Sequence, residues 1–241
     1  MNLKKTILNL ARRLGYDIVQ FNQDNPLWRR IRLFEDAGIN HVLDVGANSG
    51  DYGRALRSFG YSGRITSFEP LPEAFAELAG CAASDPLWTY ENLALGDKQE
   101  TRKINIAGNS VSSSFLDMLP AHLNGAPDSA YVGQVAVPIN RLIDIFGRYI
   151  DSDDRVYLKI DTQGYEKNVL IGAGDALKEI KLIQIEASLR PLYDSAFLAD
   201  EAIQFLRGHS FEPVSFEPGF ADPVTGHQLQ ANIIFKRTGI P

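Results

Sequence analysis

The sequence predicts an α/β fold: a doubly wound, mainly parallel sheet with helices on both faces, preceded by an N-terminal helical extension. Short apolar runs rich in β-branched residues alternate with helix-like segments from residue 41 onward, which is typical of βαβ units. The first run ends in a glycine-rich turn, Val45-Gly-Ala-Asn-Ser-Gly50. The second run ends in an acidic residue, Glu69.

The chain has 241 residues and 44% hydrophobic content, enough for one α/β domain with a full core. We expect residues 1–38 to form the helical extension, with a break at 22–26, and residues 39–241 to form the α/β domain. The periodicity weakens at about 101–134, where glycine, proline, asparagine and aspartate are frequent. We expect an irregular insertion there, serving as a lid or a substrate loop.

Each element of the domain follows from a local pattern. Predicted strands are short apolar or alternating runs bounded by turn residues: 42–45, 65–68, 88–93, 103–106 as an edge strand, 134–138, 155–160 and 182–187. Predicted helices are the amphipathic runs between them: 52–59, 72–79, 141–149, 165–171 and 200–208. Segments 211–216 and 231–236 are expected to close the sheet as a hairpin around the turn-rich residues 218–226.

The turn after the first predicted strand has the features of a nucleoside site. Gly46 and Gly50 let the backbone turn tightly and approach a ligand. Glu69 follows Gly46 by 23 residues, close to the ~20 at which nucleotide-binding βαβ units place a carboxylate for ribose hydroxyls. Asp44 disfavours a phosphate there, and the G-x-G-x-x-G of nicotinamide-dependent oxidoreductases is absent. A cofactor with a ribose and a cationic amino-acid tail fits better, and S-adenosylmethionine is one.

Several blocks of the sequence resemble one family. They are Leu43-Asp-Val-Gly-Ala-Asn-Ser-Gly50, Phe68-Glu-Pro70, Asn92-Leu-Ala-Leu95, Leu158-Lys-Ile-Asp-Thr-Gln-Gly-Tyr-Glu166 and Ile185-Glu186. Over roughly residues 40–210 the chain resembles the FkbM-type S-adenosylmethionine-dependent methyltransferases, and the K-I-D-x-x-G-x-E block is the most specific part. One departure is Asn140-Arg-Leu-Ile143, where members usually carry a Leu-Asp pair.

The resemblance implies a fold, a reaction and a cofactor site. The fold is the Rossmann-like class I methyltransferase sheet of seven strands, with the last strand antiparallel. The reaction is methylation of a hydroxyl on a sugar, a glycan or glycolipid, or a polyketide-type product. The residues expected to contact S-adenosylmethionine are Asp44, Gly46, Asn48, Gly50, Glu69, Asn92 and Ala94. A non-catalytic module of the same fold that binds protein partners is the alternative function.

Carboxylates are the candidate catalytic groups. Asp161 and Glu186 end two predicted strands, at the edge of an open sheet where ligands bind. Either one of them is the general base for the acceptor hydroxyl, or both bind Mg²⁺ or another hard divalent cation that acidifies it. Glu166 has a catalytic or a capping role. Asp161 has an alternative role as the N-cap of the following helix.

Two histidines and a serine run are further candidates. His122 and His227 lie in predicted loops that can reach the site, and each is a possible base. Ser112, Ser113 and Ser114 form a loop that either hydrogen-bonds to the cofactor or substrate, or is simply polar.

Composition limits the partners. A net charge of −6 argues against a broad phosphate-binding surface, so a nucleic acid is not expected. The single cysteine excludes an internal disulfide framework and, with no secretory signal, predicts a cytoplasmic location. The basic N-terminus places Leu3, Ile7, Leu10 and Leu14 on one helical face. This face either contacts a membrane peripherally or packs on the domain or on the partner subunit of a homodimer, and packing is the favoured interpretation.

Overall fold

The computed structural model describes residues 3–239 and divides into two compact units, 1–36 and 37–241. The four terminal residues, which the sequence analysis assigns to the ends of the two expected regions, lie outside the described part. The first unit contains α1 (Leu3–Arg13) and nearly all of α2 (Pro26–Ala37). No helix among the described residues is long and apolar enough to cross a membrane.

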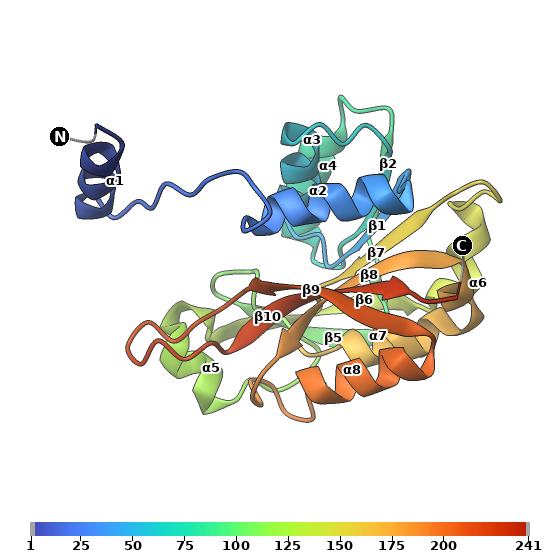
Figure 1. Cartoon of the computed structure of the whole chain (residues 1–241). Coiled ribbons are helices and arrows are strands. Elements are labelled where there is room, and N and C mark those ends of the chain that lie inside the picture. The colour runs from blue at the N-terminus through green and yellow to red at the C-terminus, as the bar shows by residue number, and fades with distance from the viewer. Residues whose placement is uncertain (1–2, 240–241) are drawn as a thin grey trace. The chain divides into compact units, whose positions relative to one another are not determined.

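The second unit is built on a seven-stranded sheet in the order β3-β2-β1-β7-β8-β10-β9 (Figure 1). Its strands are β1 (His41–Val45), β2 (Arg64–Phe68), β3 (Trp88–Glu91), β7 (Val156–Ile160), β8 (Ile180–Ser188), β9 (Phe211–Pro218) and β10 (Gln230–Arg237). Strand β10 runs antiparallel to both of its neighbours, and the other pairs are parallel. The structure therefore confirms the predicted mainly parallel sheet with an antiparallel last strand.

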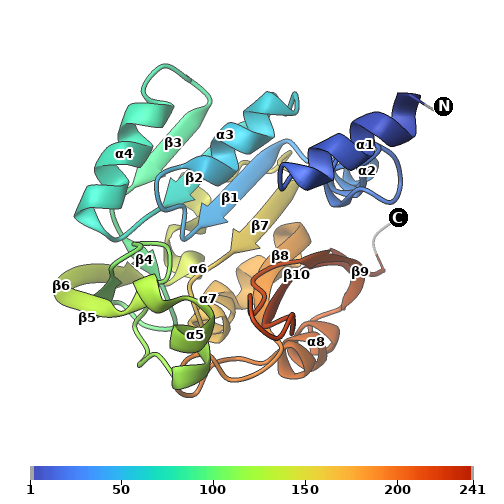
Figure 2. The ribbon, with the colours of Figure 1, turned by 90° about the vertical axis from the view of Figure 1, so that its left-hand side faces the viewer.

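Helices cover both faces of this sheet. One face carries α3 (Asp51–Ser58) and α4 (Pro72–Ala82); the other carries α6 (Leu142–Ile145), α7 (Glu166–Ala173) and α8 (Ala199–Gly208) (Figure 2). From β1 the chain crosses to β2, and from β7 it crosses to β8, in opposite directions along the sheet. Right-handed crossovers then place the helices on opposite faces. A crevice opens at the carboxyl ends of β1 and β7, where open α/β sheets bind their ligands.

The core lies around the central strands. Every residue of β1 and β7 is buried, as expected for parallel strands covered on both sides. The largest apolar cluster joins these strands to α7, α8 and the antiparallel edge through Leu43, Leu158, Val169, Leu206 and Phe235. This packing gives the carboxyl ends of the strands a rigid base.

A separate three-stranded sheet stands beside the first, in the order β4-β6-β5. Its strands are β4 (Ala94–Leu95), β5 (Glu100–Ala107) and β6 (Tyr131–Asn140). Two short helical pieces, α5 (Pro120–Gly125) and the 3-10 helix η1 (Pro127–Ser129), connect β5 to β6. Further 3-10 helices are η2 (Phe146–Arg148) and η3 (Gly174–Glu179).

The second sheet makes residues 101–134 more ordered than the sequence indicates. Most of β5 and the start of β6 fall in this range, and the predicted strand 134–138 joins the small sheet rather than the large one. Strand β5 begins with exposed polar residues, and β6 alternates only weakly between exposed and buried positions. The alternation of hydrophobic and polar residues in β5 and β6 is therefore weak, which explains why the sequence indicates less order here. Residues 108–119 do form an irregular loop.

Candidate cofactor and acceptor site

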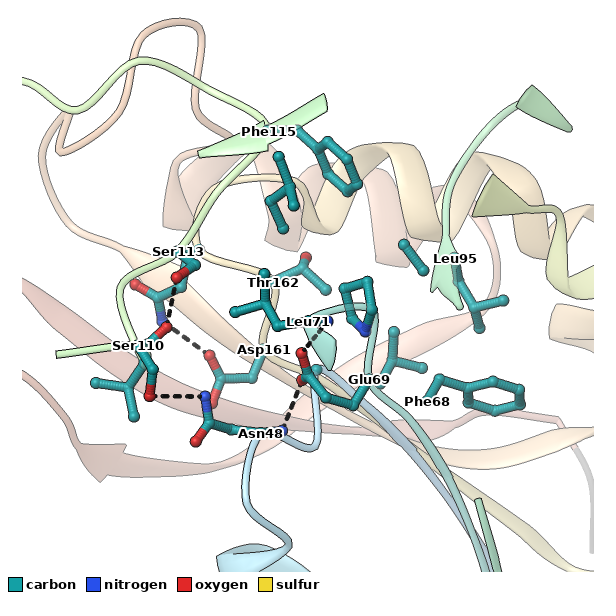
Figure 3. Close-up of a pocket in the computed structure, with 17 residues that line it drawn as sticks. Asn48, Phe68, Glu69, Leu71, Leu95, Ser110, Ser113, Phe115, Asp161 and Thr162 are labelled. Carbon is teal, nitrogen blue, oxygen red and sulfur yellow. Dashed lines mark hydrogen bonds between the residues drawn. The ribbon is translucent and has the colours of Figure 1, made fainter. Parts of the chain in front are cut away.

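A cavity of about 110 Å³, open to solvent, lies outside the carboxyl ends of β1, β2 and β7 (Figure 3). Its polar wall consists of Asn48, Glu69, Ser110, Ser113, Asp161, Thr162 and Gln163. Its apolar wall includes Phe68, Leu71, Ala94, Leu95, Ile104 and Phe115. The cavity occupies the position that the glycine-rich turn predicts for a cofactor.

The β1–α3 turn approaches the β7 loop so closely that only glycine fits at residue 46. A Cβ on Gly46 would lie 1.9 Å from the carbonyl oxygen of Asp161, and the residue has a φ of 76°. The amides of Gly46 and Ala47 both donate to the carbonyl of Phe68, at 3.0 and 3.1 Å. The turn is thus fixed between the ends of β2 and β7.

Glu69 connects this turn to the cavity. Its side chain is buried; Oε2 accepts from the amide of Asn48 and Oε1 from the amide of Leu71, both at 2.8 Å. Burial raises the pKa of Glu69 to about 7, against the two amide hydrogen bonds. Each carboxylate oxygen keeps a lone pair, so Glu69 shapes the turn and still offers acceptors to a hydroxyl in the cavity.

Asp44 lies beneath the cavity rather than in its wall. It is fully buried and pairs in register with Lys159 on β7, whose Nζ is 3.0 Å from Asp44 Oδ1. Lys159 Nζ also donates to the carbonyl of Gly46 at 2.9 Å. Burial disfavours the charge on Lys159, but the Asp44 and Asp161 carboxylates outweigh it and raise its pKa. This ion pair supports the glycine turn from below.

The other predicted cofactor contacts divide into two groups. Gly46, Asn48, Glu69 and Ala94 line the cavity. Gly50 instead begins α3, with a φ of 86°, and its Cα faces Leu78 and Trp88. Asn92 donates through Nδ2 to the carbonyls of Glu69 and Pro70, at 2.9 and 3.2 Å. With Asp44, these residues shape the cavity without lining it.

A second cavity, of about 260 Å³, shares Val111, Asp161 and Gln163 with the first. Its remaining lining residues come from the 108–119 loop, α5, β8, β10 and the β9–β10 hairpin: Asn109, Ser112, His122, Ala126, Glu186, Phe220 and Gln230. Asp161 and Gln163 therefore stand at the boundary between two cavities. This arrangement suits a reaction between two ligands.

Gln163 organises that boundary, and the sequence analysis did not single it out. Its Nε2 donates to Asp161 Oδ1 at 2.9 Å and to Glu186 Oε2 at 2.6 Å. Its Oε1 accepts from the Tyr193 hydroxyl at 2.8 Å, and its carbonyl accepts from Ser114 Oγ at 2.6 Å. The left-handed backbone of Gln163, with a φ of 53°, directs the amide toward both carboxylates.

The two carboxylates differ in environment. Glu186 is partly buried in the wall of the second cavity, and Gln230 Nε2 donates to the same Oε2 at 2.9 Å. Burial first, and then the charges of Asp161 and Glu166, raise the pKa of Glu186 well above its ordinary range. The side chain of Asp161 is 33% exposed. Asp161 therefore lies at the boundary of both cavities, and Glu186 holds its proton to a higher pH than an ordinary glutamate does.

The surroundings of this pair do not fit a divalent cation. Amide N–H groups of Gln163 and Gln230 point at the carboxylate oxygens, and Lys159 Nζ lies 3.6 Å from Asp161 Oδ2. Such donors take the positions that metal ligation needs. Within residues 3–239, no group of three or more His, Cys, Asp or Glu side chains is arranged to hold a metal. The expected metal site at Asp161 and Glu186 is therefore not supported.

Glu166 closes the turn after β7. Its Oε1 accepts from the amides of Thr162 and Gly164, at 2.9 and 3.1 Å, and from Thr162 Oγ1 at 3.2 Å. Burial raises the pKa of Glu166 to about 7. It lines neither of the two cavities. The N-cap of α7 is Tyr165, without a side-chain hydrogen bond, so Asp161 does not cap this helix.

One of the two candidate histidines reaches the site. His122 is buried, lines the second cavity and lies between the rings of Tyr193 and Phe220, with centroids 5.0 and 5.3 Å away. Burial lowers the pKa of His122, which favours the neutral ring. His227 is exposed in the β9–β10 hairpin and lines neither cavity.

The three serines occupy three different positions. Ser112 Oγ lies 3.3 Å from His122 Nε2 in the second cavity, Ser113 lines the first cavity, and Ser114 holds the Gln163 carbonyl. The serine run therefore belongs to the walls of both cavities.

The sheet order and the cavity at the ends of β1 and β7 define a domain of the class I methyltransferase type. Residues 44–213 match the model of the methyltransferase FkbM domain, which is most of the chain. The chain belongs to the FkbM methyltransferase family, as its motifs indicate.

Solved structures with a similar fold come from several bacteria. A methyltransferase FkbM from Methylobacillus flagellatus is 13% identical over 81% of this chain and 43% of its own, with a TM-score of 0.50. A Thermobifida fusca protein assigned as a methyltransferase is 14% identical over 88% and 78%, with a TM-score of 0.50. M. capricolum TrmK, in complex with S-adenosylhomocysteine, is 8% identical over 86% and 68%, with a TM-score of 0.47.

The two likenesses with a TM-score of 0.50 show the fold alone, because the identities are low. The chain spans less than half of the length of the M. flagellatus protein. No curated protein matches it.

Proposed function

We propose that the chain is an S-adenosylmethionine-dependent O-methyltransferase whose acceptor is a hydroxyl of a sugar, glycan, glycolipid or polyketide-type product. The observation that carries this proposal is the pair of cavities that meet at Asp161 and Gln163. One cavity suits the cofactor and the other the acceptor.

The first cavity has the groups that S-adenosylmethionine needs. Glu69 offers carboxylate acceptors to the ribose hydroxyls, and the apolar wall around Leu71, Ala94 and Phe115 suits an adenine ring. Asn48, Ser110 and Thr162 present polar groups to the amino-acid end. When bound, this cofactor supplies a sulfonium methyl that is electrophilic without further activation.

The chain's own contribution to the reaction is a base and its orientation. Asp161, at the boundary of the cavities, accepts the proton of the acceptor hydroxyl. Gln163 holds the Asp161 carboxylate in place through its 2.9 Å hydrogen bond. The raised pKa of Glu186 reduces the negative charge that this residue adds beside the base.

The second cavity suits a neutral, polyhydroxylated acceptor. Its two carboxyl groups belong to Asp161 and Glu186, it has no Lys or Arg among the described residues that line it, and the lowered pKa of His122 keeps that ring neutral. Phosphate or carboxylate groups on an acceptor would meet repulsion there. Amide and hydroxyl groups of Asn109, Ser112 and Gln230 instead offer hydrogen bonds, with the Phe220 ring as an apolar surface.

The cofactor assignment is tested by calorimetric titration. We expect S-adenosylhomocysteine to bind and NAD(P) not to bind. Glu69→Ala should weaken binding by roughly 1.5–3 kcal/mol, as for the loss of a charged hydrogen-bond partner. Glu77→Ala, which removes an exposed carboxylate from α4, is the matched control and should bind normally. Unchanged affinity in Glu69→Ala would contradict the ribose role of Glu69.

The reaction is tested with radiolabelled S-adenosylmethionine and a panel of sugars, glycolipids and polyketides. On the acceptor found, Asp161→Asn should lower turnover by ~10²–10⁴ while cofactor affinity stays within about threefold. Asp175→Asn, at an exposed carboxylate, should leave both unchanged. Near-normal turnover in Asp161→Asn would move the base to Glu186 or His122. Cofactor binding without transfer to any acceptor would support the non-catalytic module instead.

A further inference from the structure

Residues 7–21 concentrate exposed apolar side chains. Seven large hydrophobic residues there are at least half exposed: Ile7 50%, Leu10 58%, Leu14 67%, Tyr16 72%, Ile18 52%, Val19 64% and Phe21 59%. In the rest of the described chain, exposed large hydrophobic residues occur singly or in pairs. Exposed apolar side chains concentrated in one segment indicate an interaction surface.

The same segment is basic and amphipathic. Ile7 and Leu10 on α1, and Leu14 directly after it, follow the spacing of one helical face. Lys5, Arg12 and Arg13 are exposed, and α1 contains no acidic residue. Residues 1–21 include four basic side chains and one acidic side chain, a net charge of +3 in a chain of −6. The acidic one, Asp17, pairs with Arg12 at 3.0 Å.

We propose that residues 3–21 dock onto an anionic lipid surface, with α1 lying in the plane of the interface. The apolar face enters the boundary between headgroups and acyl chains, and the cations contact lipid phosphates. Tyr16, Ile18 and Phe21 extend the apolar surface beyond the helix. The positive charge of this segment and the negative charge of the rest of the chain favour binding through the N-terminus.

Two other roles for residues 3–21, spanning a membrane and pairing with a second copy of the chain, fit less well. Helix α1 has 11 residues, about half of the ~20 that a membrane-spanning helix needs. Pairing with the same segment of a second copy would bring two clusters of positive charge together. Three turns of helix also offer far less than the ~800 Å² that each partner buries in a stable interface.

Co-sedimentation of the full chain with vesicles tests the proposal. We expect binding to an equal mixture of phosphatidylcholine and phosphatidylglycerol, and none to phosphatidylcholine alone. Ile7→Asp with Leu10→Asp should weaken binding by about tenfold or more because it removes the apolar face. Lys5→Glu with Arg13→Glu should also weaken binding, because it replaces two cations that contact lipid phosphates with carboxylates. Thr6→Ser with Asn9→Gln, on the same helix, is the control and should bind like the parent.

Three results would overturn the proposal: no binding to either vesicle, equal binding to both, or full binding by the Ile7→Asp/Leu10→Asp variant. Sedimentation velocity of the same proteins distinguishes a subunit interface. A dimer that this variant dissociates, without any vesicle binding by the parent, would assign the face to self-association. Thermal unfolding confirms that each variant remains folded, and these outcomes do not depend on methyl transfer.

Discussion

Three residues that line the first cavity adopt left-handed backbone conformations, which are unfavourable for residues other than glycine. They are Asn48, Ser110 and Gln163, with φ values of 47°, 55° and 53°. Such conformations cost of order 1–3 kcal/mol each and persist only where the surroundings impose them. Asn48 Nδ2 donates to Ser110 Oγ at 3.3 Å, and Ser114 holds the Gln163 carbonyl. The chain thus concentrates strain where the walls must be positioned before ligands bind.

Gln163 is expected to act as a positioning residue. Gln163→Ala removes the amide that holds Asp161 and Glu186, so turnover should fall by about 10²-fold while cofactor affinity changes little. The Gln163 hydrogen bond also lowers the pKa of Glu186, so its loss should move the titration of the coupled carboxyl pair to higher pH in the kcat/KM profile. Gln99→Ala, at an exposed site, is the control. An unshifted pH profile would assign Gln163 a purely structural role.

Lys159 is expected to dominate local stability. Lys159→Met leaves Asp44 fully buried without its counter-charge, which should lower the free energy of unfolding by about 3–5 kcal/mol. Asp44→Asn together with Lys159→Met should recover much of this loss, because neither charge then remains. Urea unfolding of the two variants measures both effects. Equal loss in the single and double variants would refute the ion-pair explanation.

Glu69 should make cofactor binding depend on pH. Its pKa of about 7 means that the ionised acceptor becomes populated as the pH rises from about 6 to about 8. Affinity for S-adenosylhomocysteine should therefore increase over this interval. Stability should change in the opposite direction: the raised pKa stabilises the fold below the ordinary value of 4.5, and this contribution is lost as the pH rises through about 7. Calorimetry on Glu69→Gln should give a flatter pH profile.

At the scale of elements, the β1–α3 turn tolerates no side chain at residue 46. Gly46→Ala would bring a methyl group to 1.9 Å from the Asp161 carbonyl at a φ of 76°, so we expect loss of several kcal/mol of stability and of cofactor binding. Gly80→Ala on α4 meets nothing within 4 Å and should stabilise the chain by about 0.5–1 kcal/mol. Thermal unfolding of both variants compares them directly.

The main sheet could be predicted because its strands are buried runs with clear boundaries. Strands β1 and β7 are buried at every position, and their apolar runs identify them. The small sheet was harder to predict from the sequence. The first four residues of β5 include none that is buried, so its hydrophobic period does not begin until Ile104.

The site residues that could be predicted are those that come directly after a strand. Asp161 lies directly after β7, and Glu69 directly after β2. The fold brings together three further residues from distant segments, Gln163, Tyr193 and Gln230, and no local sequence pattern predicts their contacts. Lys159 lies within an apolar strand, and its pairing with Asp44 could not be predicted because it depends on the register of two strands far apart in sequence.

At the scale of the whole molecule, negative charge should select acceptors. The chain carries −6, and the acceptor cavity contains Asp161 and Glu186. We expect kcat/KM for a neutral acceptor to be insensitive to salt, because no charge-charge term is screened. A phosphorylated analogue of the same acceptor should be a poorer substrate that improves as salt is added. Preference for the phosphorylated form at low salt would contradict the assignment of the second cavity.

The wall common to both cavities has a thermodynamic consequence. Val111, Asp161 and Gln163 line both cavities, so on the proposed function whichever ligand binds first fixes a surface that the other must contact. Linkage requires the effect to be reciprocal. The factor by which S-adenosylhomocysteine changes the affinity for the acceptor must equal the factor by which the acceptor changes the affinity for S-adenosylhomocysteine. If that factor exceeds one, acceptor and spent cofactor accumulate together as a dead-end complex. Excess acceptor would then inhibit its own methylation, and cofactor exchange would set the pace of turnover.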